Sequence, residues 1–454
     1  MKRCTFIVLV LALVSGMAGS LWSQETPKDL SPFVALGYEL VLNLYPQPVV
    51  QNGQLKDKGP LGKQRYLGKQ TVGSGTIISK DGLILTNYHV YAVSEYQYDS
   101  EKNVLLELVP ASRDMVVYVL GKDPLMPPEP KYLARPIAVN KAKDMCLLQI
   151  IAHLDTGQPI QSPNFKYVDL GNPYDIPLNS ELTILGYPGK GGSTVTITAG
   201  QFLGYTKDSR YAEDGSIKTD ATIAGGNSGG STLYKKRLVA VPTRVSNPVE
   251  KGFDFGYLHP VTWAVEPFAV ARLKYGIRVP ELDSRWLSSD YNPDPAKSHT
   301  FIGGRVYAVQ SNGAIPEAVV LIFRGDRTLE QIVQLIQEEE TIMTVLKIQT
   351  LAKRGAPPEA LAAAFGLTLE QVQQILALQV TEGSLSPDLR RKLQGEFFYR
   401  IDQTDEDGFF LANVPRNQNL NLFVKRKGFR NLTRTIRSGN DLYQDLGRIS
   451  IVEY

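Results

Sequence analysis

Short hydrophobic runs separated by turn-forming residues dominate the first 275 residues of the chain. The runs are rich in β-branched residues and end at Gly, Pro, Asn or Asp, and Asp81-Gly82 between two of them is a typical hairpin turn. Runs of this length and spacing predict many short strands, as in β-sandwiches and β-barrels. The clearest runs are residues 75–78, 83–86, 116–120, 182–185 and 194–198.

A second β-rich region begins near residue 299, after a polar, proline-containing stretch at 276–298 that we interpret as a linker. Helical spacing interrupts this region at about 327–394. Thr328 and Thr368 each open a Thr-Leu-Glu-Gln capping box, and Pro358 starts a further helix. A mainly β chain is therefore predicted, with a helical insertion inside its second module. The strands predicted there are residues 302–309, 318–323, 397–401, 409–411 and 420–424.

Residues 1–23 have the pattern of a signal peptide. Lys2 and Arg3 precede an apolar run, and Ala18-Gly19-Ser20 offers a small-x-small cleavage site. The run is too short for a comfortable membrane span, so no stable membrane anchor is expected. A buried N-terminal helix is the alternative. Cleavage would leave Cys146 as the single cysteine, without an intrachain disulfide, which fits a bacterial periplasmic or secreted protein that is stabilised by burial.

The charge balance argues against a nucleic-acid partner. The formal net charge of the 454 residues is only +3, which gives no general attraction to nucleic acid or anionic membranes. Residues 359–372 resemble a helix-turn-helix, but the second helix, 369–380, has no Lys or Arg to contact phosphates. The acidic turn at 405–408 could bind calcium, yet it lacks the acidic ligand that ends an EF-hand loop.

A glycine-rich loop around Ser228 is the strongest chemical signal. Residues 220–230 read DATIAGGNSGG. Glycines permit positive φ and close approach, so such a loop can present a serine hydroxyl while backbone N–H groups converge beside it. Taken alone, the loop is either a nucleophile beside an oxyanion hole or a glycine-rich hairpin with an incidental serine.

A histidine and an aspartate stand in contexts that favour the first interpretation. His89 follows a predicted strand within TNYHV, residues 86–90. Asp144 opens the apolar run DMCLL, residues 144–148, where a carboxylate can be desolvated beside an imidazole and fix its tautomer. The other acidic residues between His89 and Ser228 lack this context and fit loops or turns.

These segments, in the order His, Asp, Ser, resemble the motifs of chymotrypsin/trypsin-like serine proteases, and most closely the bacterial HtrA (Deg) branch. The resemblance covers residues 70–262 and implies a two-barrel protease domain at 24–275. It implies that His89 is the general base, that Asp144 orients it and that Ser228 is the nucleophile. It further implies an oxyanion hole formed by the backbone N–H groups of Gly226 and Ser228, protein or peptide substrates, and no metal or cofactor.

The same resemblance points to residues of a specificity pocket. Thr222, six residues before Ser228, would lie at the base of the pocket; it is uncharged, which argues against a trypsin-like preference for Lys or Arg. Leu258, in the segment GYLHP that resembles a pocket wall of the HtrA branch, would narrow it. We therefore expect small or medium apolar side chains in the pocket. His259 could instead reach the pocket and favour an acidic side chain, or be packed.

The C-terminal module departs from the HtrA pattern, in which PDZ domains follow. Residues 299–454 resemble instead a carboxypeptidase regulatory-like β-sandwich, from the opening strands after residue 300 and the hairpin at 404–411. This module is expected to serve as an accessory binding domain, through a homo-oligomer or a protein partner. A different class of function, a non-catalytic binding or scaffold protein on a protease fold, is the alternative that the intact His–Asp–Ser set disfavours.

Overall fold

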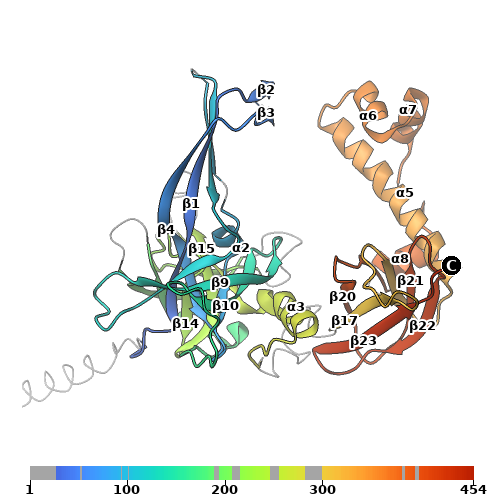
Figure 1. Cartoon of the computed structure of the whole chain (residues 1–454). Helices are drawn as coiled ribbons and strands as arrows, with labels where there is room; N and C mark the ends of the chain where they lie inside the picture. The colour runs from blue at the N-terminus through green and yellow to red at the C-terminus, as the bar shows by residue number, and fades with distance from the viewer. Residues whose placement is uncertain are drawn as a thin grey trace, which may run out of the picture. The chain divides into compact units, whose positions relative to one another are not determined.

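The computed structural model separates the chain into two compact units, Met1–Lys297 and Ser298–Tyr454. Strands dominate both units (Figure 1), which confirms the prediction of a mainly β chain. The predicted signal peptide, 1–23, and residues 282–298 of the predicted linker lie outside the described residues. The structure describes residues 27–51, 54–93, 95–100, 102–188, 194–206, 215–245, 255–281, 299–380, 384–393 and 398–454.

The first barrel occupies the N-terminal half of unit 1. Its strands follow the order β4-β5-β10-β9-β8-β1, and the pairing of β1 with β4 closes the ring, while β7 and β6 extend the sheet beyond β1. The predicted turn at Asp81-Gly82 joins β4 to β5, with Gly82 at φ +85° and its N–H donated to the Ser79 carbonyl at 3.0 Å. The strands are β1 (Phe33–Tyr45), β4 (Lys63–Ile77), β5 (Leu83–Thr86), β6 (Glu95–Asp99), β7 (Val104–Pro110), β8 (Met115–Val119), β9 (Glu129–Asn140) and β10 (Met145–His153).

Strands β1 and β4 continue past the barrel as an arm, along which β1 also pairs with β7, and β2 (Val49–Gln51) and β3 (Gln54–Asp57) lie at its tip (Figure 1). This arm was not predicted from the sequence. The beginning of β4 is exposed, whereas its last five residues, 73–77, are buried. Only this end of β4 therefore belongs to the core, and it lies next to the site described below.

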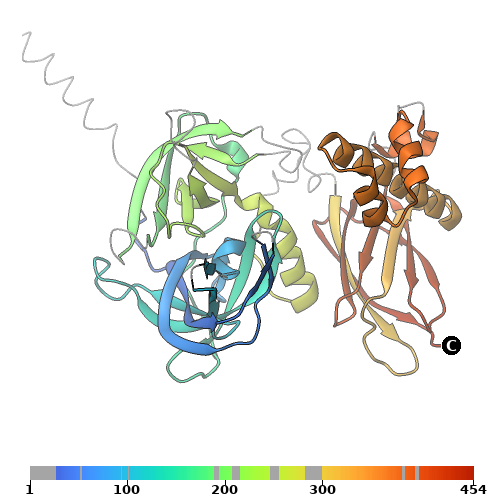
Figure 2. The same ribbon diagram turned by 90° about the horizontal axis from the view of Figure 1, so that it is seen from above.

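The second barrel is closed by β11-β12-β13-β16-β15-β14. Figure 2 shows it in green beside the blue first barrel, so the predicted two-barrel fold is confirmed. Helix α3 (Val265–Tyr275) follows the second barrel and packs against β9 and β10 of the first. The remaining elements of unit 1 are α2 (Tyr88–Tyr91), η1 (Pro173–Asp175), β11 (Glu181–Gly186), β12 (Thr196–Tyr205), β13 (Ile217–Thr219), β14 (Ser231–Tyr234), β15 (Arg237–Val245), β16 (Gly256–Pro260) and η2 (Val261–Ala264).

Unit 2 is a sandwich of two sheets, β20-β17-β23 and β19-β18-β21-β22, that share one core. The helical insertion leaves this sandwich between β18 and β19, and both predicted capping boxes are present at Thr328 and Thr368. Its long helix α5 buries Ile332 but leaves Met343 60% exposed, although both fit the helical spacing. The elements are β17 (His299–Ala308), β18 (Val319–Arg324), α5 (Leu329–Lys353), α6 (Pro358–Phe365), α7 (Leu369–Ala377), α8 (Pro387–Leu393), β19 (Tyr399–Gln403), β20 (Phe409–Pro415), β21 (Asn419–Lys425), β22 (Leu432–Arg437) and β23 (Tyr443–Ile451).

Candidate active site

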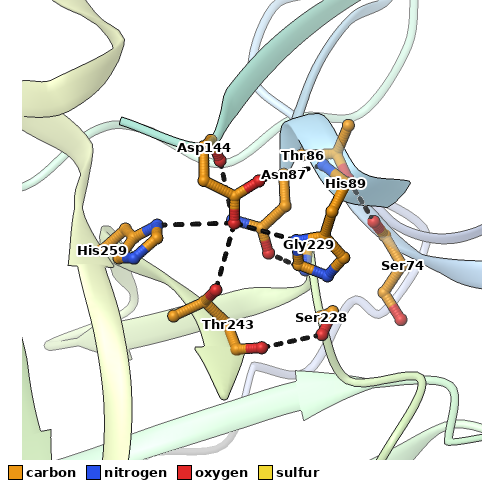
Figure 3. A network of polar contacts seen from close by, with 9 residues as sticks. All are labelled: Ser74, Thr86, Asn87, His89, Asp144, Ser228, Gly229, Thr243 and His259. Atoms are coloured by element: carbon orange, nitrogen blue, oxygen red, sulfur yellow. Dashed lines mark hydrogen bonds and ion pairs between the residues drawn. The ribbon is translucent and has the colours of Figure 1, made fainter. Parts of the chain in front are cut away.

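The three residues predicted to be catalytic, His89, Asp144 and Ser228, lie close together where the two barrels meet (Figure 3). His89 lies in the short helix α2, directly after β5. Asp144 precedes β10 of the same barrel, and Ser228 lies in the loop that enters β14 of the second barrel. The site is therefore assembled from ends of strands, which a rigid β scaffold positions well.

Asp144 holds His89 at two points. Its Oδ2 lies 2.8 Å from Nδ1 of the imidazole, and its Oδ1 accepts the backbone N–H of His89 at 2.9 Å. Burial raises the pKa of the Asp144 carboxyl, but the two hydrogen bonds from His89 and the electrostatic attraction of His89 and His259 together lower it more, so the pKa lies below its ordinary value. A carboxylate in this arrangement fixes both the orientation and the tautomer of the ring.

An unusual backbone conformation presents the Asp144 carboxylate. Its φ is +51°, in the left-handed region that Asp and Asn tolerate better than most residues. The Asp144 carbonyl accepts the backbone N–H of Tyr88 at 3.1 Å and the Asn87 side-chain amide at 3.0 Å. These two bonds tie the start of β10 to the segment that carries His89.

Asn87 also reaches the serine loop. Its Oδ1 accepts the backbone N–H of Gly229 at 2.7 Å, and the residue is fully buried. The Asn87 side chain thus links the backbone carbonyl of Asp144 to the backbone N–H of Gly229, the residue after Ser228. The sequence analysis included Asn87 in the motif TNYHV without assigning it a role; its place beside the histidine was the available signal.

Thr243 on β15 contacts both ends of the site. Its Oγ1 donates to Asp144 Oδ2 at 3.1 Å, and its backbone carbonyl accepts the Ser228 hydroxyl at 3.0 Å. The pairing of β15 with β16 is irregular between Pro242 and Arg244, so the bulged Thr243 is free of that ladder. Thr243 was not predicted from the sequence.

Ser74 at the buried end of β4 anchors the serine loop to the first barrel. Its Oγ donates to the Gly226 carbonyl at 2.7 Å and accepts the Tyr187 N–H at 2.8 Å, while its own N–H donates to the Ser228 carbonyl at 2.9 Å. Thr86 Oγ1 completes the cluster by donating to the Ser74 carbonyl at 2.7 Å.

We expect Ser74→Ala to destabilise the protein by about 1–3 kcal/mol, because the buried Tyr187 N–H and Gly226 carbonyl both lose their partner. Urea denaturation would measure the change in the free energy of unfolding. Ser112→Ala is the matched control, since the Ser112 hydroxyl is exposed and bonds only near its own loop. An equal loss of stability in both variants would contradict the anchoring role.

The other predicted site residues are placed as follows. Gly226 has φ +101° and lies two residues before Ser228. The side chain of Thr222 is exposed, and its carbonyl accepts the Thr198 hydroxyl at 3.0 Å. Leu258 is fully buried among the core residues of the second barrel. Of the two residues predicted to line the pocket, Thr222 is thus exposed and Leu258 is buried.

The described residues contain no cluster of three or more His, Cys, Asp and Glu side chains placed to hold a metal ion. In the same parts of the chain, no helix is both long and apolar enough to cross a membrane. Cys146, next to the site on β10, is buried, and burial raises the pKa of its thiol.

Comparisons with known proteins match part of unit 1 to peptidases. Residues 73–241 match the model of the trypsin-like peptidase domain. A probable periplasmic serine endoprotease, DegP-like, of Rickettsia prowazekii (strain Madrid E) is 24% identical over 394 residues, which is 84% of this chain and 64% of that protein. Its counterpart in Rickettsia conorii (strain ATCC VR-613 / Malish 7) is 26% identical over 193 residues, 42% of this chain and 31% of that protein.

The matched region thus spans less than two thirds of the length of either relative. The trypsin-like match contains the strands and loops that carry His89, Asp144 and Ser228. Residues 73–241 thus match a trypsin-like peptidase domain, and the chain is similar to DegP-like serine endoproteases.

Proposed function

We propose that the chain is a serine endopeptidase in which Ser228, His89 and Asp144 act together. The observation that carries this proposal is the 2.8 Å contact from His89 Nδ1 to Asp144 Oδ2, with Ser228 on the side of the ring away from the carboxylate (Figure 3). The neutral imidazole takes the hydroxyl proton as Ser228 Oγ attacks a peptide carbonyl, and returns it to the leaving amine. Water then hydrolyses the acyl-enzyme by the same proton path.

The backbone N–H groups of Gly226 and Ser228 are proposed to stabilise the oxyanion of the tetrahedral intermediate. The Ser74 hydroxyl holds the carbonyl of Gly226, and the positive φ of Gly226 sets the direction of its N–H group relative to that carbonyl. Among the described residues, no acceptor is found for either N–H group. Two donors without a partner beside the nucleophile suit a developing negative charge.

The edge of β15 is proposed to bind the substrate backbone. Strand β14 pairs with β15 only up to Ala240, whereas β16 continues along it to Val245. Among the described residues, no strand pairs with the other edge of residues 243–245, which lies next to Ser228 and suits an added substrate strand. We propose small or medium apolar side chains for the pocket to which Thr222 and Leu258 were assigned.

We further propose that the protein is exported and that unit 2 is an accessory binding domain. The relatives are described as periplasmic, and residues 1–23 have the signal-peptide pattern, so we place the mature protein in the periplasm or outside the cell. Unit 2 is proposed to be a carboxypeptidase regulatory-like sandwich that binds substrate, a protein partner or a second copy of the chain.

One contact favours a second candidate, a non-catalytic scaffold. Ser228 Oγ donates to the Thr243 carbonyl, and no hydrogen bond to His89 is found among the described residues. A resting enzyme shows the same arrangement when the substrate is absent, because catalytic hydrogen bonds are often loose in apo structures. In an active enzyme the hydroxyl must rotate from Thr243 to His89.

A fluorophosphonate probe distinguishes the two candidates, because it reacts only with an activated serine. We expect the wild-type protein to be labelled and Ser228→Ala to remain unlabelled. Ser112→Ala, which removes an exposed serine, should be labelled like the wild type. Mass spectrometry of the labelled peptide gives the modified residue. An unlabelled wild-type protein that cleaves no peptide library would support the scaffold instead.

A further inference from the structure

Asp144 faces a second imidazole. His259 on β16 has its Nδ1 3.9 Å from Asp144 Oδ2, the oxygen that also meets His89 Nδ1 at 2.8 Å and Thr243 Oγ1 at 3.1 Å. Figure 3 shows the carboxylate between the two histidine rings. The carboxylate that orients His89 is thus shared by another titratable group.

Strand β16 and the helical turn after it hold His259 in this place. Its neighbour Leu258 faces the core of the second barrel, so alternation along the strand turns the His259 side chain to the outside of that barrel. There the ring packs on Trp263 with centroids 4.6 Å apart, and the side chain is only 12% exposed. A partly buried ring in contact with an aromatic side chain has few alternative positions.

Within the described part of the chain, Asp144 is the acidic residue in ion-pair range of His259, and positive groups lie around the two side chains. His89 lies on the other side of the carboxylate. Lys143 has its Nζ 5.9 Å from the Trp263 ring centroid. Lys218 on β13 stands opposite Tyr257, two residues before His259 on the same face of β16. On the other neighbouring strand, β15, the residue opposite His259 is the apolar Val241. A proton on His259 is therefore attracted by the Asp144 carboxylate.

We propose that His259 is a positioning residue that shares the Asp144 carboxylate with His89 and so sets how the reaction responds to acid. The inference rests on the proposed function. As long as His259 is neutral, the carboxylate serves His89. When His259 gains a proton, its positive charge opposes a second proton on His89 and weakens the support that Asp144 gives to the imidazolium in the transition state. His89 therefore takes up a proton only at lower pH, and peptide hydrolysis is slower while His259 is protonated.

The test is the pH dependence of kcat/KM for a peptide substrate between about pH 4 and pH 8. For the wild type we expect a broad acid limb with two steps. His259→Gln and His259→Phe should each give a single step, moved to higher pH by roughly 0.5–1 unit, because the opposing charge is gone. The phenylalanine keeps an aromatic ring against Trp263, so a shift common to both variants cannot come from lost packing.

His153→Gln is the matched control, since His153 ends β10 while Asp144 precedes its start. Its acid limb should superimpose on that of the wild type. If both His259 variants fold, as judged by their thermal melts, and retain the wild-type limb, the proposal is overturned.

A second measurement does not depend on catalysis. In the Ser228→Ala background, imidazole NMR signals of His89 report its titration with and without His259→Gln. A midpoint that moves to higher pH in the double variant supports the shared carboxylate, even if the wild-type protein proves inactive and the proposed function fails. An unchanged midpoint overturns the inference and leaves the proposed function standing.

Discussion

Asp144→Asn is expected to lower kcat for peptide hydrolysis by about 10⁴-fold. In the wild type the carboxylate accepts the Nδ1–H of His89, so Nε2 is the ring atom that can take the serine proton. The asparagine amide can donate to Nδ1 instead, which puts the ring proton on Nε2 and removes the general base. An amide also gives no negative charge to stabilise the imidazolium.

The fold should survive this substitution, which makes the kinetic result interpretable. Asn tolerates the left-handed backbone of position 144, where φ is +51°, as well as Asp does. The bonds that Tyr88 and Asn87 donate go to the backbone carbonyl of residue 144 and are unaffected by the change of side chain. The amide oxygen can still accept the backbone N–H of His89.

Steady-state kinetics with a thermal melt of each protein provide the measurement. Asp114→Asn is the matched control: it removes a carboxylate of the same barrel whose partner is Arg135, and the rate should stay within about twofold of the wild type. The proposed role of Asp144 would be wrong if Asp144→Asn retained more than about one tenth of the wild-type kcat in a folded protein.

The amino-acid sequence singled out His89, Asp144 and Ser228 as candidate site residues, and the structure brings their side chains close together. His89 follows a hydrophobic run, Asp144 precedes one and Ser228 lies in a glycine-rich loop, and strand ends and loops of this kind are local features that short motifs encode. The capping boxes at Thr328 and Thr368 were equally readable, because the residues that bond each other are three positions apart.

The contacts that hold the site together could not be predicted from the sequence, because they join segments that are far apart in the chain. Ser74 meets Gly226 across 152 residues, and Thr243 meets Asp144 across 99. A small polar residue within a strand gives no sign of its partner until the register and closure of both barrels are known. His259 was likewise weighed as a pocket residue or a packed one, and the structure places it beside Asp144, a partner that the sequence analysis had not considered.

Glycine at position 229 is required by both backbone and space. Its φ is +79°, and a Cβ atom there would lie under 3.0 Å from Thr86 Oγ1 and from the Ser74 carbonyl oxygen. The Gly229 N–H meanwhile approaches the Asn87 side chain at 2.7 Å and the Pro242 carbonyl at 3.0 Å. Gly229 is thus enclosed by Thr86 and Ser74 on one side and by the partners of its own N–H on the other. A shift of either set of groups would disturb a buried hydrogen bond.

We therefore expect Gly229→Ala to lower both stability and activity. The strained φ costs about 1–3 kcal/mol and the crowding about 1–3 kcal/mol more, while a loop displaced by about 1 Å would lower kcat/KM by about 10²-fold. Gly225→Ala is the matched control in the same loop, because a Cβ atom there meets nothing within 4 Å and its φ is not positive. Urea denaturation and peptide kinetics should separate the two variants clearly. Equal behaviour would mean that the loop relaxes freely, and that its glycines do not fix the position of Ser228.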